Sequence, residues 1–430
     1  MNIIIDYTSI ISWSSPDIYT KMHLERFIIE NNQININEKE LSDLIKKYGE
    51  KTINDELVKL IISGKVTFPY KKYFMDDVNI MYKRLCEYKP KIRYSSYIIP
   101  NIKFNWNFDN TFQGKYMTFV SPNKDYDTMD IIVDYFQEHA RLSALRSDTT
   151  KTPLQCWTIK ECVTIIVSYA MSLKSISSYT LRESIYHAKI TEATQFKPTL
   201  VVSIIKTLYA DPSSINYLDI SSGWGDRLVG AMAAGVKKYL GFDPNTTLKV
   251  GHDKIRERFI SLTNGDISNP TSRFEIRYEP FESTDLGNST FDLVFSSPPF
   301  WDFEKYTDLP GQSIITHNTY VKWIVGFLFT SLARACQHLN NRGFIIIHIT
   351  DVYRTKVVEP MILFIQGYLK NIHFQGVISS LAEESSNKHR PMWVWKKNTT
   401  LEIKDAKAAR INLAKFYPAI HSGMKGIYYM

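Results

Sequence analysis

The stretch from residue 217 to residue 245 constrains the fold more than any other part of the chain. It opens with the apolar run Tyr217-Leu-Asp-Ile and continues through Ser-Ser-Gly-Trp-Gly-Asp-Arg into a helical pattern. A second apolar run, Tyr239-Leu-Gly-Phe, ends at Asp243. Glycines at positions 223 and 225 let the backbone turn sharply. The sequence therefore predicts a strand, a glycine-bearing turn, a helix and a second strand that ends at an acid.

This order of elements is typical of α/β sheets that bind nucleotides. Gly223 and Gly225 allow backbone amides to approach a ligand closely at the start of the helix. Asp243 is placed to accept hydrogen bonds from ribose hydroxyls, as acids do in such sheets. The pattern alone fits many nucleotide binders, so it does not identify the ligand.

The second informative stretch is a buried strand, Phe291-Asp-Leu-Val-Phe-Ser, that stops at Ser297-Pro298-Pro299-Phe300. A Pro-Pro pair after a strand is often only a terminator, because neither proline can donate to a ladder. Taken together, with one further strand between them, the two stretches resemble the amino-methyltransferases. These are class I S-adenosylmethionine enzymes that methylate exocyclic amino groups of bases, and their tetrad is Asp/Asn/Ser-Pro-Pro-Tyr/Phe/Trp. The resemblance covers roughly residues 190 to 398.

The resemblance implies S-adenosylmethionine as cofactor, bound by several separate segments. An aromatic-x-Pro element closes over the cofactor in this family, and residues 196–198 look like it. The first-strand acid would face the methionine amino end, and the second-strand acid would take the ribose. At position 221, where the family commonly has glycine, this chain has serine. The implied cofactor residues are Phe196, Lys197, Pro198, Asp219, Ser221, Gly223, Gly225, Asp243 and Phe281, the last as an adenine contact.

The resemblance also implies a catalytic role for Ser297, Pro298, Pro299 and Phe300. An exocyclic amino nitrogen is a poor nucleophile, because its lone pair is delocalised into the ring. The Ser297 side chain and the Pro298 carbonyl can accept its two hydrogens, while the two prolines keep the loop rigid. Phe300 offers a face on which the target base can stack, a contact worth roughly 1–3 kcal/mol.

The substrate is less defined than the reaction. Adenine N6 and cytosine N4, in DNA or in RNA, all remain open. A related set of enzymes methylates protein glutamine and usually has Asn in the first tetrad position. A non-catalytic, methyltransferase-like subunit that binds nucleic acid is a further alternative, although such subunits usually lose one of the two motifs.

Composition narrows the partners. The net charge of +8 and the pI near 9.0 favour a polyanion, and therefore nucleic acid. No apolar run approaches the ~20 residues that span a bilayer, so we expect an intracellular, soluble protein of the cytoplasm or nucleus without a membrane partner. The four cysteines form no C-x-x-C pair, which suggests no metal site. The sequence leaves the oligomeric state open, homo- or hetero-oligomers included.

The predicted fold class is α/β: a Rossmann-like, seven-stranded class I methyltransferase sheet with a mixed α/β N-terminal extension. Strands are predicted at 216–220, 237–242, 274–279, 291–296, 343–349, 373–379 and 391–397, the last two as an antiparallel hairpin. Helices are predicted at 226–234, 245–262, 319–339 and 355–370. Alternation of strands and helices indicates parallel pairing with helices on both faces.

Four regions are predicted along the chain. Residues 1–125 form an accessory region, a candidate for nucleic-acid recognition, with short helices at 38–49 and 54–64 and strand-like, aromatic text from Val66. Residues 126–212 form a helical segment that leads into the catalytic domain, with helices at 127–145, 158–172 and 199–209. Residues 190–398 form the methyltransferase catalytic domain. Residues 399–430 are a basic tail, either a nucleic-acid contact or a packed extension.

Overall fold

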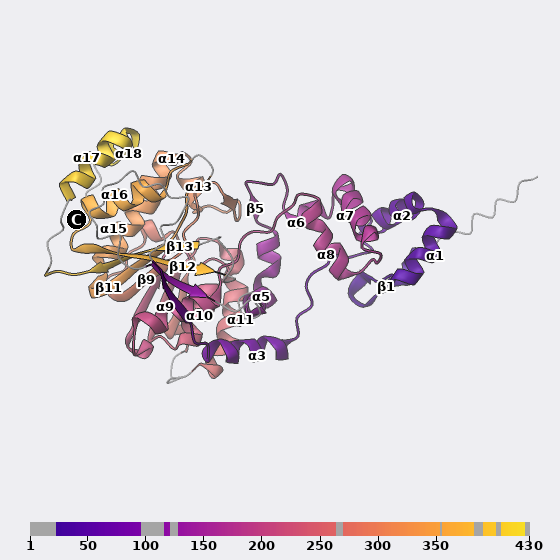
Figure 1. Cartoon of the computed structure of the whole chain (residues 1–430), viewed down its shortest axis with the longest axis horizontal. Coiled ribbons are helices and arrows are strands. Elements are labelled where there is room, and N and C mark those ends of the chain that lie inside the picture. Colours follow the sequence, from indigo (N-terminus) through magenta and orange to yellow (C-terminus); the bar gives the residue numbers. More distant parts are fainter. Residues whose placement is uncertain are drawn as a thin grey trace, which may run out of the picture. The chain divides into compact units, whose positions relative to one another are not determined.

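The computed structural model describes residues 23–95, 116–120, 128–263, 270–352, 355–381, 390–400 and 406–425 (Figure 1). The chain divides into two compact units. The first combines Met1–Pro69 with Trp157–Ser184, and the second combines Tyr70–Cys156 with Ile185–Met430. The predicted regions 1–125 and 126–212 are thus each shared between the two units, and their functional roles stay predictions.

The first unit is mainly helical. Its first α-helix begins with a capping box, in which the Asn37 side chain accepts from the Glu40 amide at 3.0 Å and the Glu40 side chain accepts from the Asn37 amide. Gly49, at φ 84°, separates the first two helices. The described elements are η1 (Leu24–Phe27), β1 (Ile28–Ile29), η2 (Glu30–Asn32), β2 (Gln33–Ile34), α1 (Glu38–Tyr48), α2 (Glu50–Ile62), α7 (Lys160–Ser172) and the first part of α8 (Ser178–His187). The predicted helices at 38–49, 54–64 and 158–172 therefore form.

The second unit is built on one nine-stranded sheet, with the order β3-β4-β12-β13-β11-β9-β6-β7-β8. All its strands run in the same direction except β13 and β3. The strands are β3 (Lys91–Ser95), β4 (Tyr116–Val120), β6 (Asn216–Asp219), β7 (Lys238–Phe242), β8 (Phe274–Arg277), β9 (Phe291–Ser296), β11 (Leu339–His348), β12 (Ile372–Leu381) and β13 (Arg390–Lys397). The predicted α/β, Rossmann-like fold is confirmed.

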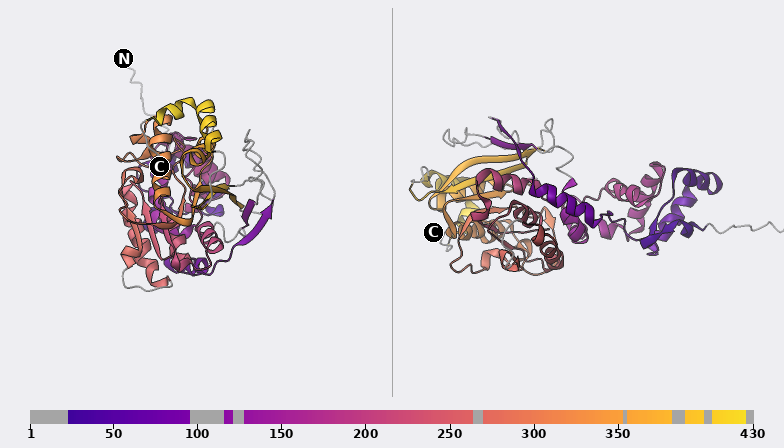
Figure 2. Two further views of the ribbon diagram at one scale, coloured as in Figure 1. Left: turned by 90° about the vertical axis from the view of Figure 1, so that its left-hand side faces the viewer. Right: turned by 90° about the horizontal axis from the view of Figure 1, so that it is seen from below.

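All seven predicted strands form, and the last two make the predicted antiparallel hairpin. The sheet is larger than predicted, because β3 and β4 from the N-terminal region continue it beyond β12; Figure 2 shows these purple strands beside the yellow ones. The prediction of strand-like text from Val66 was wrong for residues 67–74, which form no strand and precede the helix α3 (Met75–Cys86), whereas further along this text Lys91–Ser95 does form a strand, β3. The aromatic stretch 104–108 lies outside the described residues.

Helices cover both faces of the sheet, and alternate strand residues face opposite sides, as the pleat requires. Tyr217 and Ile346 pack with one layer of helices, whereas Leu218 and Ile345 pack with the other. The first layer contains α3, α5 (Ile131–Leu142), α9 (Pro198–Leu208), α10 (Asp226–Ala234) and α11 (Lys249–Phe259). The second contains η8 (Trp323–Phe329, a π-helix), α15 (Thr330–Gln337), α16 (Val358–Tyr368) and α17 (Ala406–Phe416).

Short elements of the second unit include β5 (Leu145–Arg146), α6 (Pro153–Cys156), α12 (Pro270–Arg273), β10 (Glu304–Lys305), α13 (Ser313–Thr316), α14 (Tyr320–Lys322) and α18 (Pro418–Gly423). The helical middle of the basic tail, α17, packs on α16: Leu413 is fully buried and Arg410 Nε donates to the Gly367 carbonyl. Within the described part of the chain, no helix is both long and apolar enough to cross a bilayer.

Close packing of α9 against α10 leads to a stability prediction. A Cβ added at Gly230, inside α10, would lie 2.4 Å from Val201 Cβ and 3.1 Å from the Pro198 carbonyl. We expect Gly230→Ala to destabilise the protein by about 1–3 kcal/mol in urea unfolding, despite alanine's better helix propensity. Gly367→Ala, where the nearest atoms are Arg410 Cγ at 3.1 Å and the Arg410 backbone nitrogen at 3.3 Å, is the matched control with a looser contact and should cost clearly less. Equal effects of the two changes would contradict this account.

Candidate functional site

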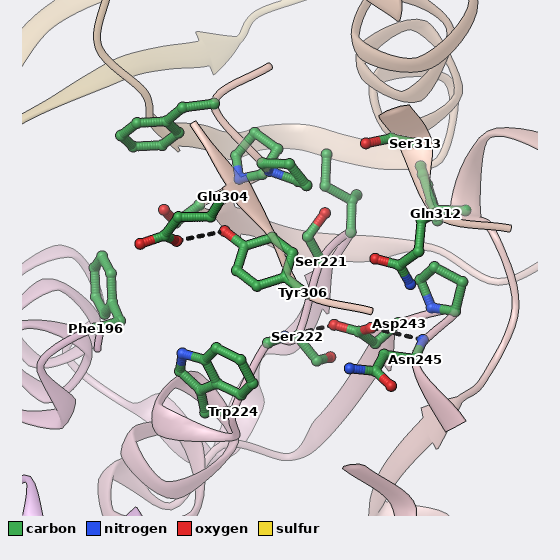
Figure 3. Close-up of a pocket in the computed structure, with 18 of the residues that line it drawn as sticks. Phe196, Ser221, Ser222, Trp224, Asp243, Asn245, Glu304, Tyr306, Gln312 and Ser313 are labelled. Carbon is green, nitrogen blue, oxygen red and sulfur yellow. Dashed lines mark hydrogen bonds between the residues drawn. The ribbon is translucent and has the colours of Figure 1, made fainter. Parts of the chain in front are cut away.

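A cavity of about 400 Å³ opens beyond the carboxyl ends of β6, β7 and β9, where ligands bind in sheets of this kind (Figure 3). Its wall also contains His348 and Thr350, at the end of β11, and Phe327 of η8. It brings together residues from both predicted motifs and from the segment before α9. The predicted residues that line it are Phe196, Ser221, Gly223, Asp243, Phe281, Ser297, Pro298, Pro299 and Phe300.

Four predicted cofactor residues lie behind the wall of this cavity. Lys197 forms an ion pair with Asp130, and Pro198 is the first residue of α9. Gly225 precedes α10 at φ 110°, where an added Cβ would lie 3.1 Å from His252 Cδ2. Asp219 is fully buried and is not part of the lining.

The Asp219 carboxylate is surrounded by donors from four segments. Arg227 Nε donates to Oδ2 at 2.8 Å, and the Tyr239 hydroxyl donates to the same oxygen at 2.9 Å. Oδ1 accepts from the Ser296 hydroxyl at 2.7 Å and from the Ser221 amide at 3.3 Å. Asp219 thus joins β6, β7, β9 and α10 just below the cavity.

Asp243 lies at the cavity wall, as predicted from its place after β7. Its Oδ2 accepts from the Gly223 amide at 2.8 Å, and its Oδ1 accepts from the Asn245 amide at 2.9 Å (Figure 3). Burial raises the pKa of this carboxyl to about 6, against the lowering effect of the two amides. Each carboxylate oxygen has a second lone pair, so the group can still accept from a ligand.

The glycine turn is held from behind by His252 of α11. His252 Nε2 lies 3.0 Å from the Gly223 carbonyl, to which it donates, and Nδ1 lies 3.0 Å from the Tyr278 hydroxyl. The ring is fully buried, and burial lowers its pKa to about 4, so it is neutral at physiological pH. Gly223 itself has φ 59°, which glycine adopts without strain.

Arg227 is the only Lys or Arg among the described residues that line the cavity. Its guanidinium is buried; Nη2 donates to the Ser221 carbonyl, and Cζ lies 5.3 Å from the centre of the Phe196 ring. No hydrogen bond from Nη1 to a described residue is present. Burial raises the pKa of the neighbouring Asp226 well above its usual range.

The tetrad turns sharply at its end. Trp301 has φ 54°, an uncommon value for a residue other than glycine, and its ring packs 5.6 Å from that of Trp323. Phe300 instead faces the cavity, with its ring 5.5 Å from His348. His348 donates from Nδ1 to the Pro391 carbonyl at 2.8 Å, which fixes the orientation of its ring.

The segment after the tetrad closes one side of the cavity. Glu304 accepts from the Tyr306 hydroxyl at 2.8 Å (Figure 3). It also accepts from the Thr194 amide at 2.8 Å. Trp224 packs on Tyr306 at 5.6 Å and donates from Nε1 to the Thr194 carbonyl at 3.0 Å. Glu304 also pairs with Arg146 through the short β5–β10 ladder. The segment near residue 194 is therefore tied to both motifs.

The sequence analysis missed several residues of this site, Arg227, His252 and His348 among them. Arg227 follows directly after the glycine turn and could have been noticed as a charge inside an apolar helix pattern. His252 and His348 gave no signal, because their positions depend on how distant segments pack.

Comparison with models of protein families gives no match, and neither does comparison with curated proteins. Solved structures give distant similarities. One is TrmN from Thermus thermophilus, with 13% identity and a TM-score of 0.32 over 47% of this chain and 49% of that one. Another is an O-methyltransferase of a Brevibacillus brevis multienzyme in complex with S-adenosyl-L-homocysteine, with 12% identity, a TM-score of 0.32 and coverage of 58% and 86%.

A third is a putative rRNA-methylase from Clostridium thermocellum, with 15% identity, a TM-score of 0.28 and coverage of 43% and 86%. The chain spans only about half the length of the TrmN structure, 49%. With scores this low, the function has to be argued from the residues of the cavity itself.

The buried His252 leads to a prediction of pH dependence. Its pKa is about 4 in the folded protein and about 6.5 when unfolded, so between these values only the unfolded chain binds the proton. Its contribution to stability is therefore lost as the pH falls from 6.5 to 4. We expect the stability advantage of the wild type over His252→Gln to grow by roughly 3 kcal/mol from pH 4 to pH 6.5.

This difference can be measured by urea unfolding at several pH values. Asp243 acts in the opposite direction, because its raised pKa stabilises the fold at low pH and this contribution is lost as the pH rises through about 6. Both proteins carry Asp243, so the comparison isolates His252. A difference in stability that does not change with pH would contradict the prediction.

Proposed function

We propose that this protein is an S-adenosylmethionine-dependent methyltransferase that acts on the exocyclic amino group of a base, adenine N6 or cytosine N4, in a nucleic acid. The observation that carries the proposal is that one cavity is lined both by the glycine turn with Asp243 and by Ser297–Phe300. The two motifs lie more than fifty residues apart in the sequence. A simple strand stop would not need to share a cavity with a nucleotide-binding turn.

The cavity's chemistry fits the cofactor. Asp243 retains acceptor capacity for two ribose hydroxyls, next to a glycine turn that leaves room for a ligand. Arg227, the only Lys or Arg in the described lining, suits a carboxylate, and we assign it to the methionine carboxylate. Phe281, which is almost fully buried, offers an apolar contact for adenine. S-adenosylmethionine supplies the electrophilic methyl group; the protein binds and orients.

The tetrad residues would act on the target amino group. The Ser297 hydroxyl and the Pro298 carbonyl accept its two hydrogens and so favour a geometry in which the nitrogen lone pair is exposed. The rings of Pro298 and Pro299 restrict the loop, which keeps these acceptors in position. Phe300, braced edge-on by His348, provides the stacking face for the base.

Charge supports nucleic acid as the substrate and points to the second unit. The first unit contains 11 of the 52 Lys and Arg residues and 12 of the 44 Asp and Glu residues. The second unit contains the remaining 41 and 32, and therefore all of the excess positive charge. The second unit includes residues 70–125 of the predicted N-terminal region. This segment carries the exposed phenylalanine Phe74 and several exposed basic residues: Lys71, Lys72, Lys83, Arg84, Lys89 and Lys91.

The cofactor assignment can be tested by calorimetry. Asp243→Ala should weaken S-adenosylmethionine binding about 100-fold, because two hydrogen bonds to a charged acceptor are lost. Wild-type affinity should also fall below about pH 6, where the Asp243 carboxyl protonates. Asp308→Ala, which removes an exposed acid, is the control and should bind normally. No binding by the wild type at millimolar cofactor would refute the assignment.

The catalytic assignment can be tested by radiolabel transfer to a panel of DNA, RNA and protein substrates. We expect Ser297→Ala to lose about tenfold in rate, because the Pro298 carbonyl still accepts one hydrogen. Phe300→Ala should lose up to about 100-fold, because the stacking face is gone. Both variants should keep their cofactor affinity, since the strands behind the loop are unchanged. Phe416→Ala, an exposed phenylalanine of α17, is the control.

The product decides between the alternatives. Mass spectrometry should find an N-methylated base. Methylation of a ribose oxygen or ring carbon, with both tetrad variants fully active, would exclude the proposed mechanism. Transfer to a protein glutamine alone would show that the substrate is a protein and not a nucleic acid.

A further inference from the structure

Gln312 carries a buried donor that the fold does not use. The residue is 6% exposed and lines the cavity. Its Nε2 is buried and has no hydrogen-bond partner among the described residues. Of the buried side-chain atoms that share this condition in the described part of the chain, it is the only one whose residue lines the cavity.

The other side-chain amides of the lining each have one atom engaged by the protein. Gln195 Nε2 donates to the Asp130 carbonyl at 3.0 Å and to Asp226 at 3.1 Å. Asn245 Oδ1 accepts from the Thr247 amide at 3.2 Å and from the Thr247 hydroxyl at 2.6 Å. A buried unpaired donor destabilises a free protein, so its presence in a ligand cavity indicates a partner that arrives with the ligand.

The backbone fixes where the side-chain amide of Gln312 lies. The backbone carbonyl of Gln312 accepts from the amides of Ile315 and Thr316, both at 2.9 Å, and these bonds start α13. Gly311, at φ 89°, packs so closely that an added Cβ would lie 3.2 Å from both Pro244 and Pro280. These prolines follow Asp243 and precede Phe281. In Figure 3 the Gln312 carboxamide accordingly points toward Asp243 and Asn245.

We propose that Gln312 recognises the adenine ring of the cofactor, with its carboxamide bonded to the 6-amino group and an adjoining ring nitrogen. This rests on the proposed function. A carboxamide presents an acceptor and a donor side by side, which matches the donor and acceptor at this edge of adenine. The target base is the less suitable partner, because the amide lies beside the ribose-binding acid.

The test compares two ligands, S-adenosylhomocysteine and its analogue with purine in place of adenine, by calorimetry. The wild type should bind the purine analogue about tenfold more weakly, because one hydrogen bond is missing. Gln312→Leu should bind S-adenosylhomocysteine about tenfold more weakly and should no longer distinguish the two ligands. Without ligand, this variant should have a higher Tm, because the unpaired donor is removed.

Two further variants sharpen the result. Gln312→Glu keeps an acceptor and loses the donor, so it should bind both ligands more weakly and still prefer the one with the amino group. Gln195→Leu makes the same change elsewhere in the cavity and should leave the wild-type preference intact. If Gln312→Leu keeps that preference, the inference is wrong. If the wild type binds neither ligand at millimolar concentration, the proposed function has failed instead.

Discussion

The buried carboxylate of Asp219 is the interaction on which the site depends. Its four donors come from the turn, from α10, and from the neighbouring strands β7 and β9. A carboxylate with no access to water is tolerated only when its charge and lone pairs are satisfied, so these four segments are held in one arrangement. Removing the cation of such a buried pair typically costs about 3–5 kcal/mol. Through Ser221 and Ser296, the same carboxylate fixes the starting points of both the glycine turn and the tetrad.

The sequence was sufficient for the sheet and for most of the cavity wall, because these follow from local patterns. Strand ends, glycines and prolines act within a few residues. All seven predicted strands formed, and Asp219, Asp243 and the tetrad lie at carboxyl ends of strands, as predicted. The place of β3 and β4 in the sheet could not be predicted, since β4 joins the sheet only by pairing with the distant β12, and β3 only by pairing with β4. The division of the chain into two units was equally hidden, because each unit combines two separate segments.

The roles of individual side chains were harder to predict for the same reason. A strand-end acid signals a site, but sequence cannot tell whether it faces the ligand or the core. Here Asp243 lines the cavity, whereas Asp219 is covered by Arg227 and Tyr239. That difference depends on which strands flank β6 and on an arginine at the second position of α10. His252, which braces the Gly223 carbonyl, comes from a helix whose pattern shows no reason for a histidine.

The distribution of satisfied and unsatisfied polar groups separates structural residues from residues that await a ligand. Asp219, His252 and Glu304 have their hydrogen-bonding atoms occupied by the protein, so each holds two or more segments together. Asp243 and Arg227 are only partly occupied, and Gln312 Nε2 has no partner in the described part of the chain. These incomplete groups destabilise the free protein, but the hydrogen bonds of Asp219 hold the segments around them in one fixed arrangement. Because this arrangement is fixed, the incomplete groups cannot relax toward one another, and they remain available to a ligand whose acceptors and donors match their spacing.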